Sequence, residues 1–257
     1  MRRAGLVVAE ALASTATGVK PGVTTAELDA IAAQVICGSG AKPSFLGYLG
    51  FPATTCISVN NEIVHGIPGP RVLVEGDTVS IDCGAIVDGW HGDSAVTVQV
   101  GAGSADAPAL GEAPRLAMWH GIGAARLGGR IGDISAGIED YVDSLGTPYG
   151  IVADYTGHGI GSTMHQPPDV PNLGRAGKGP KIVLGMALAI EPMLTLGSPE
   201  NSVLDDDWTV VTDDGSIACH WEHTMTVTEQ GIWVLTSPDG GEAMLRELGA
   251  PFGPLAD

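Results

Sequence analysis

The sequence lacks any apolar run long enough to span a membrane. None of its segments approaches the ~20 uninterrupted apolar residues that a transmembrane helix needs. The N-terminal stretch mimics a signal peptide, but Glu10 interrupts its apolar run after six residues. Leu6, Val7 and Leu12 fit one face of a helix better. We therefore expect an N-terminal helix and no membrane partner.

Basic residues are also scarce. The chain has 12 Lys and Arg against 30 Asp and Glu, which gives a formal net charge of −18. Nucleic acids and anionic membranes are bound through clustered Lys and Arg. The charge balance therefore argues against a direct nucleic-acid function. The hydrophobic content of 44% is ample for a packed core.

Several motifs that mark common sites are missing. The four cysteines show no CxxC spacing, which favours a reduced, cytoplasmic protein over a disulfide scaffold. The sequence contains no HExxH or HxxEH zinc motif, no GxxxxGK[ST] phosphate loop and no GxSxG nucleophile motif. GHGIGS and GIGAAR are not GxGxxG fingerprints. Single-zinc protease chemistry and nucleotide binding are therefore not indicated.

Two further parts of the sequence carry helix signals. Thr24 and Glu27 form a capping box after the Lys-Pro-Gly turn at residues 20–22. The apolar stripe that follows consists of Leu28, Ile31, Ala32 and Val35. A second helical part is expected from residue 115, after a connection of small residues at 101–114.

Strand and hairpin signals alternate with these helices. They lie at residues 56–69, 77–100, 181–194 and 208–235. The strongest is at 77–100, where two β-rich runs flank Asp88-Gly89. Helix signals followed by hairpin signals occur twice along the chain. No linker between them looks long enough to separate two domains. We therefore expect one α+β domain, residues 1–257, with similar halves at about 1–110 and 111–257.

Acids occur inside the β-rich runs, where apolar residues are expected. With Asp88-Gly89 as a two-residue turn, Asp82 faces Ala95 across the hairpin. Asp93 then lies on the same face, diagonal to Asp82 and within reach of a shared ligand. Two such carboxylates without a cation repel each other, which raises a pKa.

Two further acids repeat this pattern. Glu191 is the one acid in MALAIEPML, and Glu222 enters the β-type run CHWEHTMTV. A buried carboxylate is unfavourable unless it is paired or bound to metal. Each acid alone also fits an exposed strand position or a core acid paired with Arg. No Lys or Arg lies within the four motifs, so an oxygen-liganded divalent metal site explains the set more simply.

The histidines divide into two groups. His158 lies in TGHGIG, where glycines permit close approach to a metal, although a solvent-exposed loop histidine is the alternative. His65 has a similar setting in VHGIP, and His165 follows His158 among glycines and prolines that argue against a shared helix. His223 points away from Glu222 on a strand. The histidines expected to be structural or on the surface are His91, His120 and His220.

Five segments together resemble a known family. NEIVHGIP, IDCG…HGDSA, GHGIG…MHQPP, AIEPML and WEHTMTV resemble type I methionine aminopeptidases in order and spacing. The resemblance runs from about residue 1 to 235, with seven polar positions in register. It implies the α+β pita-bread (creatinase/aminopeptidase) fold, in which two pseudo-symmetric halves of antiparallel sheet and outer helices surround a dinuclear metal centre. It implies removal of the N-terminal methionine from nascent proteins and peptides, with a small second residue preferred.

The resemblance also implies a role for each matching side chain. The metal ligands would be Asp82, Asp93, His158, Glu191 and Glu222, which would hold two divalent ions, Co, Mn or Fe. Asp93 and Glu222 would bridge the ions. His65 and His165 would be catalytic histidines that contact the substrate, and Glu191 would also shuttle a proton. A water shared by two ions is activated to attack the peptide carbonyl.

An apolar pocket for the methionine side chain is implied as well. Its matching positions are Phe45, Tyr48, Phe51, Cys56, Met164 and Trp208, and all are apolar or soft, as a thioether requires. The alternative for these residues is plain core. The implied partner is the N-terminal Met of nascent polypeptides. Ribosome contact would be transient, because residues 198–214 hold six acids and no base, and the protein is expected to be a monomer.

Two other functions compete with this interpretation. One is a related Xaa-Pro aminopeptidase or prolidase-like enzyme of the same fold, but those usually carry an added N-terminal domain for which 257 residues leave no room. The other is a non-enzymatic peptide-binding module. Such modules typically lose metal ligands, whereas all five matching ligands and both histidines are present here.

Replacement of a bridging acid tests the metal assignment directly. We expect Asp93→Ala to abolish both metal binding and peptide cleavage, because one carboxylate would serve both ions. Metal content and turnover of the purified variant measure the effect. Normal turnover in this variant would overturn the assignment.

Overall fold

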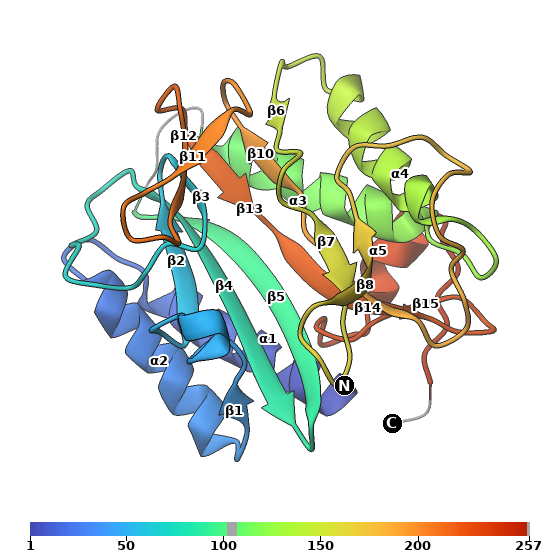
Figure 1. Ribbon diagram of the computed structural model, residues 1–257, viewed down its shortest axis with the longest axis horizontal. Coiled ribbons are helices and arrows are strands. Elements are labelled where there is room, and N and C mark those ends of the chain that lie inside the picture. Colours follow the sequence, from blue (N-terminus) through green and yellow to red (C-terminus); the bar gives the residue numbers. More distant parts are fainter. Residues whose placement is uncertain (102–106, 256–257) are drawn as a thin grey trace.

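The computed structural model describes residues 1–101 and 107–255, and its centre is a curved antiparallel sheet with helices outside it (Figure 1). The helices are α1 (Arg2–Gly18), α2 (Thr25–Gly38), α3 (Ala107–Ala124), α4 (Ile131–Ser144) and α5 (Glu242–Glu247). A single 3-10 turn, η1, covers Tyr48–Gly50. In the described residues no helix is both long and apolar enough to cross a bilayer.

The main sheet has nine strands and joins the two ends of the chain. Its path runs β1 (Lys42–Pro43), β4 (Thr78–Val87), β5 (Trp90–Gln99), β14 (Glu222–Val227), β9 (Ala187–Ile190), β7 (Gly157–Gly159) and β8 (Gln166–Val170). β2 (Thr55–Val59) pairs with β4, and β15 (Ile232–Val234) pairs with β14. The central β5–β14 pairing therefore brings residues from opposite ends of the sequence side by side.

Two smaller sheets lie beside the main one. One contains β13 (Ala218–His220), β10 (Met193–Thr195) and β6 (Gly150–Ile151). The other contains β11 (Asn201–Val203), β12 (Val210–Thr212) and β3 (Glu62–Val64). The pairing of β3 with β12 connects the two ends of the chain a second time.

Each pair of outer helices covers its own core. α1 packs on α2, β4 and β5 over one apolar cluster, in which Val8, Leu28 and Ile81 are fully buried. α3 packs on α4 and on β9, β10, β13 and β14 over a second cluster, which includes Met118 and Ile134. The sheet is therefore supported by helices on both sides of the β5–β14 junction.

The sequence-based assignments in the first half agree with the structure. Thr24 accepts a hydrogen bond from the N–H of Glu27, and the Glu27 carboxylate accepts one from the N–H of Thr24, so the capping box forms as predicted. Leu28 and Ala32 of the predicted stripe are fully buried, whereas Ile31 and Val35 are half-buried. The N-terminal stretch forms helix α1, as expected.

Two assignments in the second half were wrong. The connection expected at 101–114 is partly helix: α3 begins at Ala107 and continues through Pro114. Residues 102–106 of that connection lie outside the described residues. The strand expected at 181–194 is reduced to β9 and β10. The chain turns at Gly185, whose φ is +76°, and Pro192 lacks the N–H that a continuous strand would need.

The start of α1 is held against the second half of the chain. The Arg2 guanidinium donates hydrogen bonds to the carbonyls of Leu235 (2.9 Å), Ser237 (2.6 Å) and Pro238 (2.9 Å). The Gly5 backbone lies so close to Leu235 that a Cβ on Gly5 would meet the Leu235 carbonyl oxygen. The N-terminal helix thus fixes the chain just after β15, and this contact depends on a glycine.

We expect Gly5→Ala to lower the free energy of unfolding by about 1–3 kcal/mol, because the added methyl forces two backbone segments apart. Gly38→Ala is the matched control, since it lies at the end of α2 with no atom within 4 Å of the added Cβ. We expect the control to be neutral or to stabilise by about 0.4–1 kcal/mol. Chemical unfolding of both variants measures the difference, and equal effects would contradict the packing described.

Candidate metal centre

One cavity of about 190 Å³ lies where the two ends of the chain meet, and it gathers every site residue named from the sequence. Its lining consists of Phe45, Tyr48, Leu49, Phe51, Cys56, His65, Asp82, Asp93, His158, Met164, His165, Glu191, Trp208 and Glu222. Of these, only Leu49 was not named beforehand. Residues between 45 and 222 in the sequence therefore line one cavity.

Sheet register explains how four distant acids meet. Asp82 on β4 pairs with Ala95 on β5, as the hairpin predicts, and Ala95 pairs with Glu222 on β14. Directly paired residues share a face of the sheet, so the two acids flank a small alanine. β14 pairs in turn with β9, where His223 faces Ile190. Continuing that register by one residue places Glu191 opposite Glu222.

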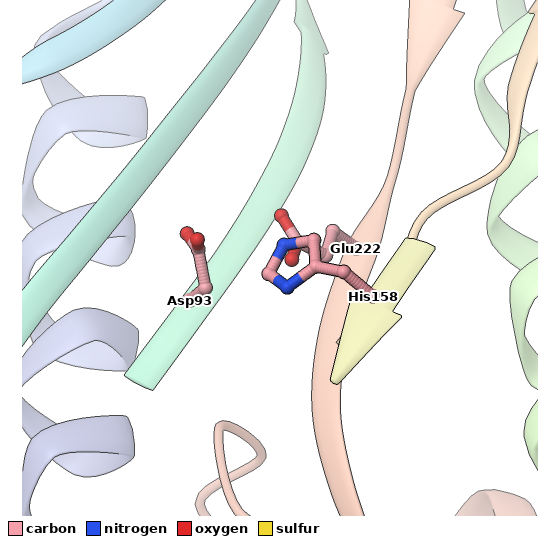
Figure 2. A group of neighbouring side chains, drawn as sticks. All are labelled: Asp93, His158 and Glu222. Atoms are coloured by element: carbon pink, nitrogen blue, oxygen red, sulfur yellow. The ribbon is translucent and has the colours of Figure 1, made fainter. Parts of the chain in front are cut away.

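Asp93 and His158 lie on the same face of the sheet. Asp93 is two residues before Ala95 on β5, so the period of two directs it to that face. His158 on β7 pairs with Ala189, which pairs with Thr224 of β14, two residues beyond Glu222. Figure 2 shows Asp93, His158 and Glu222 converging from β5, β7 and β14. Each offers a ligand atom within 4.8 Å of the others, which is suitable for one metal ion.

Glu191 lies between two histidines. Its Oε1 is 3.5 Å from Nε2 of His158, and its Oε2 is 3.6 Å from Nε2 of His220. The Nδ1 atom of His158 lies 3.0 Å from the Gly159 carbonyl, so we assign its proton to Nδ1. That hydrogen bond leaves Nε2 of His158 as a free lone pair directed into the cavity.

The carboxyl groups of the cavity are strongly perturbed. Burial, reinforced by neighbouring carboxylates, raises the pKa of Asp82, Glu191 and Glu222 well above the ordinary range. Burial raises the pKa of Asp93 to about 7. Ionised together, these groups would repel each other with no cation between them. The protein thus places four acids where they favour either protons or metal ions.

Hydrogen bonding points to the same conclusion. Asp82 Oδ1, Asp93 Oδ1 and Glu222 Oε1 are buried and have no hydrogen-bond partner among the described residues. Buried polar oxygens are normally satisfied. Carboxylate oxygens with one imidazole are a donor set that suits hard divalent ions such as Mn²⁺ or Fe²⁺. These side chains therefore fit a divalent metal.

The two remaining predicted histidines lie at the edge of this centre. The ring of His165 is 4.2 Å from that of His158 between centroids, and its Nδ1 lies 2.9 Å from the Tyr48 hydroxyl. His65 has a φ of +60° and lies edge-on to Trp208 at 6.3 Å. Burial lowers the pKa of His65 to about 4, so the ring is neutral near pH 7.

The predicted apolar pocket forms one wall of the cavity. Phe45, Phe51, Cys56 and Met164 are buried in a small cluster of their own, with Tyr48 and Trp208 packed against it. The Phe51 and Trp208 rings meet edge to face at 5.0 Å. The wall is thus formed by aromatic and sulfur-containing side chains beside the acids, as expected from the sequence.

The other histidines do not all behave as expected. His223 lies on the opposite face from Glu222, as predicted, and its Nδ1 is 2.8 Å from the Thr236 hydroxyl. His91 bonds Ser44 in the interior, and His120 stacks on Tyr141 away from the cavity. The position of His220 beside Glu191 was missed, although a histidine two residues before a strand acid is expected to share that acid's face.

Comparison with known proteins agrees with this geometry. Metallopeptidase family M24 matches residues 1–229. A relative from Mycobacterium tuberculosis named methionine aminopeptidase 1 is 52% identical over 241 residues, covering 92% of this chain and 91% of the relative. The crystal structure of methionine aminopeptidase from Rickettsia prowazekii superposes with a TM-score of 0.89 at 38% identity, covering 92% of this chain and 95% of that one.

The chain belongs to metallopeptidase family M24. It has the pita-bread fold predicted from the sequence, with a curved antiparallel sheet and outer helices. Prolidase from Pyrococcus furiosus shares the fold with a TM-score of 0.70 at 21% identity, and this chain covers 62% of it. Family membership implies the use of divalent metal.

Metal binding should stabilise the protein more at higher pH. In the metal-free protein the raised pKa of Asp93, about 7 against 3.8, means that the folded state retains a proton which the unfolded chain has released. The contribution of Asp93 to the stability of the metal-free protein therefore falls as pH rises from about 4 to about 7. A metal ion displaces that proton, so its stabilising effect grows over the same range.

Thermal unfolding with Mn²⁺ and with chelator, at about pH 6 and about pH 8, measures this effect. We expect the difference in Tm between the two samples to be larger at the higher pH. Asp93→Asn should remove most of the Tm difference between the Mn²⁺ and chelator samples. Asp88→Asn, an exposed residue at the turn of the same hairpin, should retain it. A pH-independent difference, or one that survives Asp93→Asn, would contradict the site.

Proposed function

We propose that this chain is a methionyl aminopeptidase that removes the N-terminal methionine from nascent proteins and peptides, with a small second residue preferred. The single observation that carries the proposal is the convergence of four buried acids, His158 and an apolar pocket in one cavity. The relatives named methionine aminopeptidase at up to 52% identity support the same substrate.

The proposed metal ligands are Asp82, Asp93, His158, Glu191 and Glu222, which would hold two divalent ions, Co, Mn or Fe. Asp93 and Glu222, which lie on the central strands β5 and β14, would be shared by both ions. Asp82 would bind the second ion, and His158 and Glu191 would bind the first. When bound, such ions supply an activated water and a Lewis acid for the peptide carbonyl.

The chain's own residues then orient the peptide. We assign the ring proton of His165 to Nε2, so that Nδ1 accepts from the Tyr48 hydroxyl 2.9 Å away. Nε2–H is thereby available to the scissile carbonyl, where it stabilises developing negative charge. His65 contacts the amine side of the substrate. Glu191 takes up a proton from the attacking water and passes it to the leaving amine.

The apolar wall selects the first side chain. Cys56, Met164 and the rings of Phe45 and Phe51 present a soft surface of limited size, to which a thioether is complementary. The pocket lies next to the acids, so a methionine bound there places its own peptide bond at the metal centre. An exopeptidase follows, because the free amine must lie within reach of the ions.

We propose one catalytic domain, residues 1–257, with halves 1–110 and 111–257 meeting at the cavity. The protein works as a monomer in the cytoplasm, on the N-terminal Met of nascent chains. Any ribosome contact is transient, because the segment at residues 198–214, with six acids and no base, is repelled by RNA. Neither a membrane nor a nucleic acid is a partner.

Two alternatives share the fold. A prolidase-like enzyme would act on Xaa-Pro bonds, and a peptide-binding module would not cleave at all. The prolidase from Pyrococcus furiosus is only 21% identical, so its likeness concerns the fold alone. Five matched metal ligands argue against a module that has lost catalysis.

Peptide assays separate the three functions. We expect the metal-reconstituted protein to release Met from Met-Ala-Ser and to leave an Xaa-Pro peptide intact, because the apolar wall fits a methionine side chain. Chelator should abolish the cleavage, and added Mn²⁺ or Co²⁺ should restore it. Cleavage of the Xaa-Pro peptide alone would replace the proposal with the prolidase-like function. Peptide binding without cleavage under every metal condition would favour the binding module.

A further inference from the structure

A second buried histidine, His220, lies beside the metal centre and has no role in the proposed ligand set. It is the last residue of β13 and is 2% exposed. Its Nε2 atom has no hydrogen-bond partner among the described residues and lies 3.6 Å from Oε2 of Glu191. The other oxygen of Glu191 faces His158. The Glu191 carboxylate is therefore flanked by one histidine on each oxygen.

The backbone of His220 is fixed by the hairpin that carries the acids. Its N–H is 3.2 Å from both the Ser80 and Thr97 hydroxyls, and the Thr97 hydroxyl donates to its carbonyl at 2.7 Å. Ser80 and Thr97 face each other across β4 and β5, two residues from Asp82 and Ala95 respectively. These bonds hold the His220 backbone against β4 and β5, the strands that carry Asp82 and Asp93.

We propose that His220 is a positioning residue, whose Nε2–H donates to Oε2 of Glu191 and so directs Oε1 toward the metal. The inference rests on the proposed role of Glu191 as a ligand. The present 3.6 Å separation lies just beyond hydrogen-bonding distance, so the proposed bond requires a small rotation of the Glu191 side chain. Groups that orient a metal ligand in this way commonly influence affinity by ~10–100-fold.

The proton of His220 is assigned to Nε2 because that atom faces a carboxylate oxygen. A carboxylate that ligates through one oxygen needs its second oxygen satisfied when it is buried. Among the described residues, His220 is the side chain that the structure places against Oε2. A glutamine can donate from a similar position through its amide, whereas leucine fills the space without a donor.

Metal titration tests the proposal independently of catalysis. Mn²⁺ is titrated calorimetrically into chelator-stripped wild type, H220L, H220Q and H120L. We expect H220L to weaken Mn²⁺ binding by ~10–100-fold, and H220Q to stay within about threefold of wild type, because its amide supplies the donor. H120L is the matched control, since His120 stacks on Tyr141 outside the cavity, and it should bind as wild type does.

Unfolding in chelator shows whether each variant is folded before titration. If H220L is unfolded, H220M provides the apolar comparison. Wild-type affinity in a folded apolar variant overturns the proposal, and so does a folded H220Q that binds as weakly as H220L. Cleavage of Met-Ala-Ser by wild type is scored separately. A protein with the expected affinities and no cleavage would refute the peptidase function and leave the positioning role standing.

Discussion

Repulsion among four buried carboxyl groups is the constraint on which the rest of this structure depends. Asp82, Asp93, Glu191 and Glu222 share one cavity. Burial raises the pKa of each, and neighbouring carboxylates raise the pKa of Asp82, Glu191 and Glu222 further. A fold that keeps such a group together must hold the acids on stiff elements. The main sheet does so, because β4, β5 and β14 fix three of the four by register and the end of β9 presents the fourth.

The outer helices serve this arrangement. α1 packs on β4 and β5, and the Arg2 side chain fixes its start to carbonyls just after β15. α3 and α4 cover the other half of the sheet over a separate core. Each half thus has its own support, while the acids lie at the β5–β14 junction. The apolar pocket forms the adjoining wall, so the same cavity contains both the proposed substrate pocket and the metal centre.

The neighbours of each histidine determine its role. His158 and His220 flank the same carboxylate, yet only His158 has its Nδ1 held by a neighbouring carbonyl, which frees Nε2 as a lone pair. His223 is adjacent to Glu222 in sequence but faces Ser94 and Thr236 on the other side of the sheet. Successive residues of a strand point to opposite faces of the sheet, so Glu222 and His223 have different surroundings although they are neighbours in the sequence.

The sequence by itself determined the hairpin register, because Asp88-Gly89 allows only a short turn and thereby aligns Asp82 with Ala95. It also determined the Thr24 capping box and the set of chemically unusual acids, since these depend on near neighbours. The sequence analysis missed the position of His220 against Glu191, the start of α3 and the break between β9 and β10. Only the tertiary structure decided the meeting of β5 with β14, because long-range pairing depends on how two cores and their helices pack together.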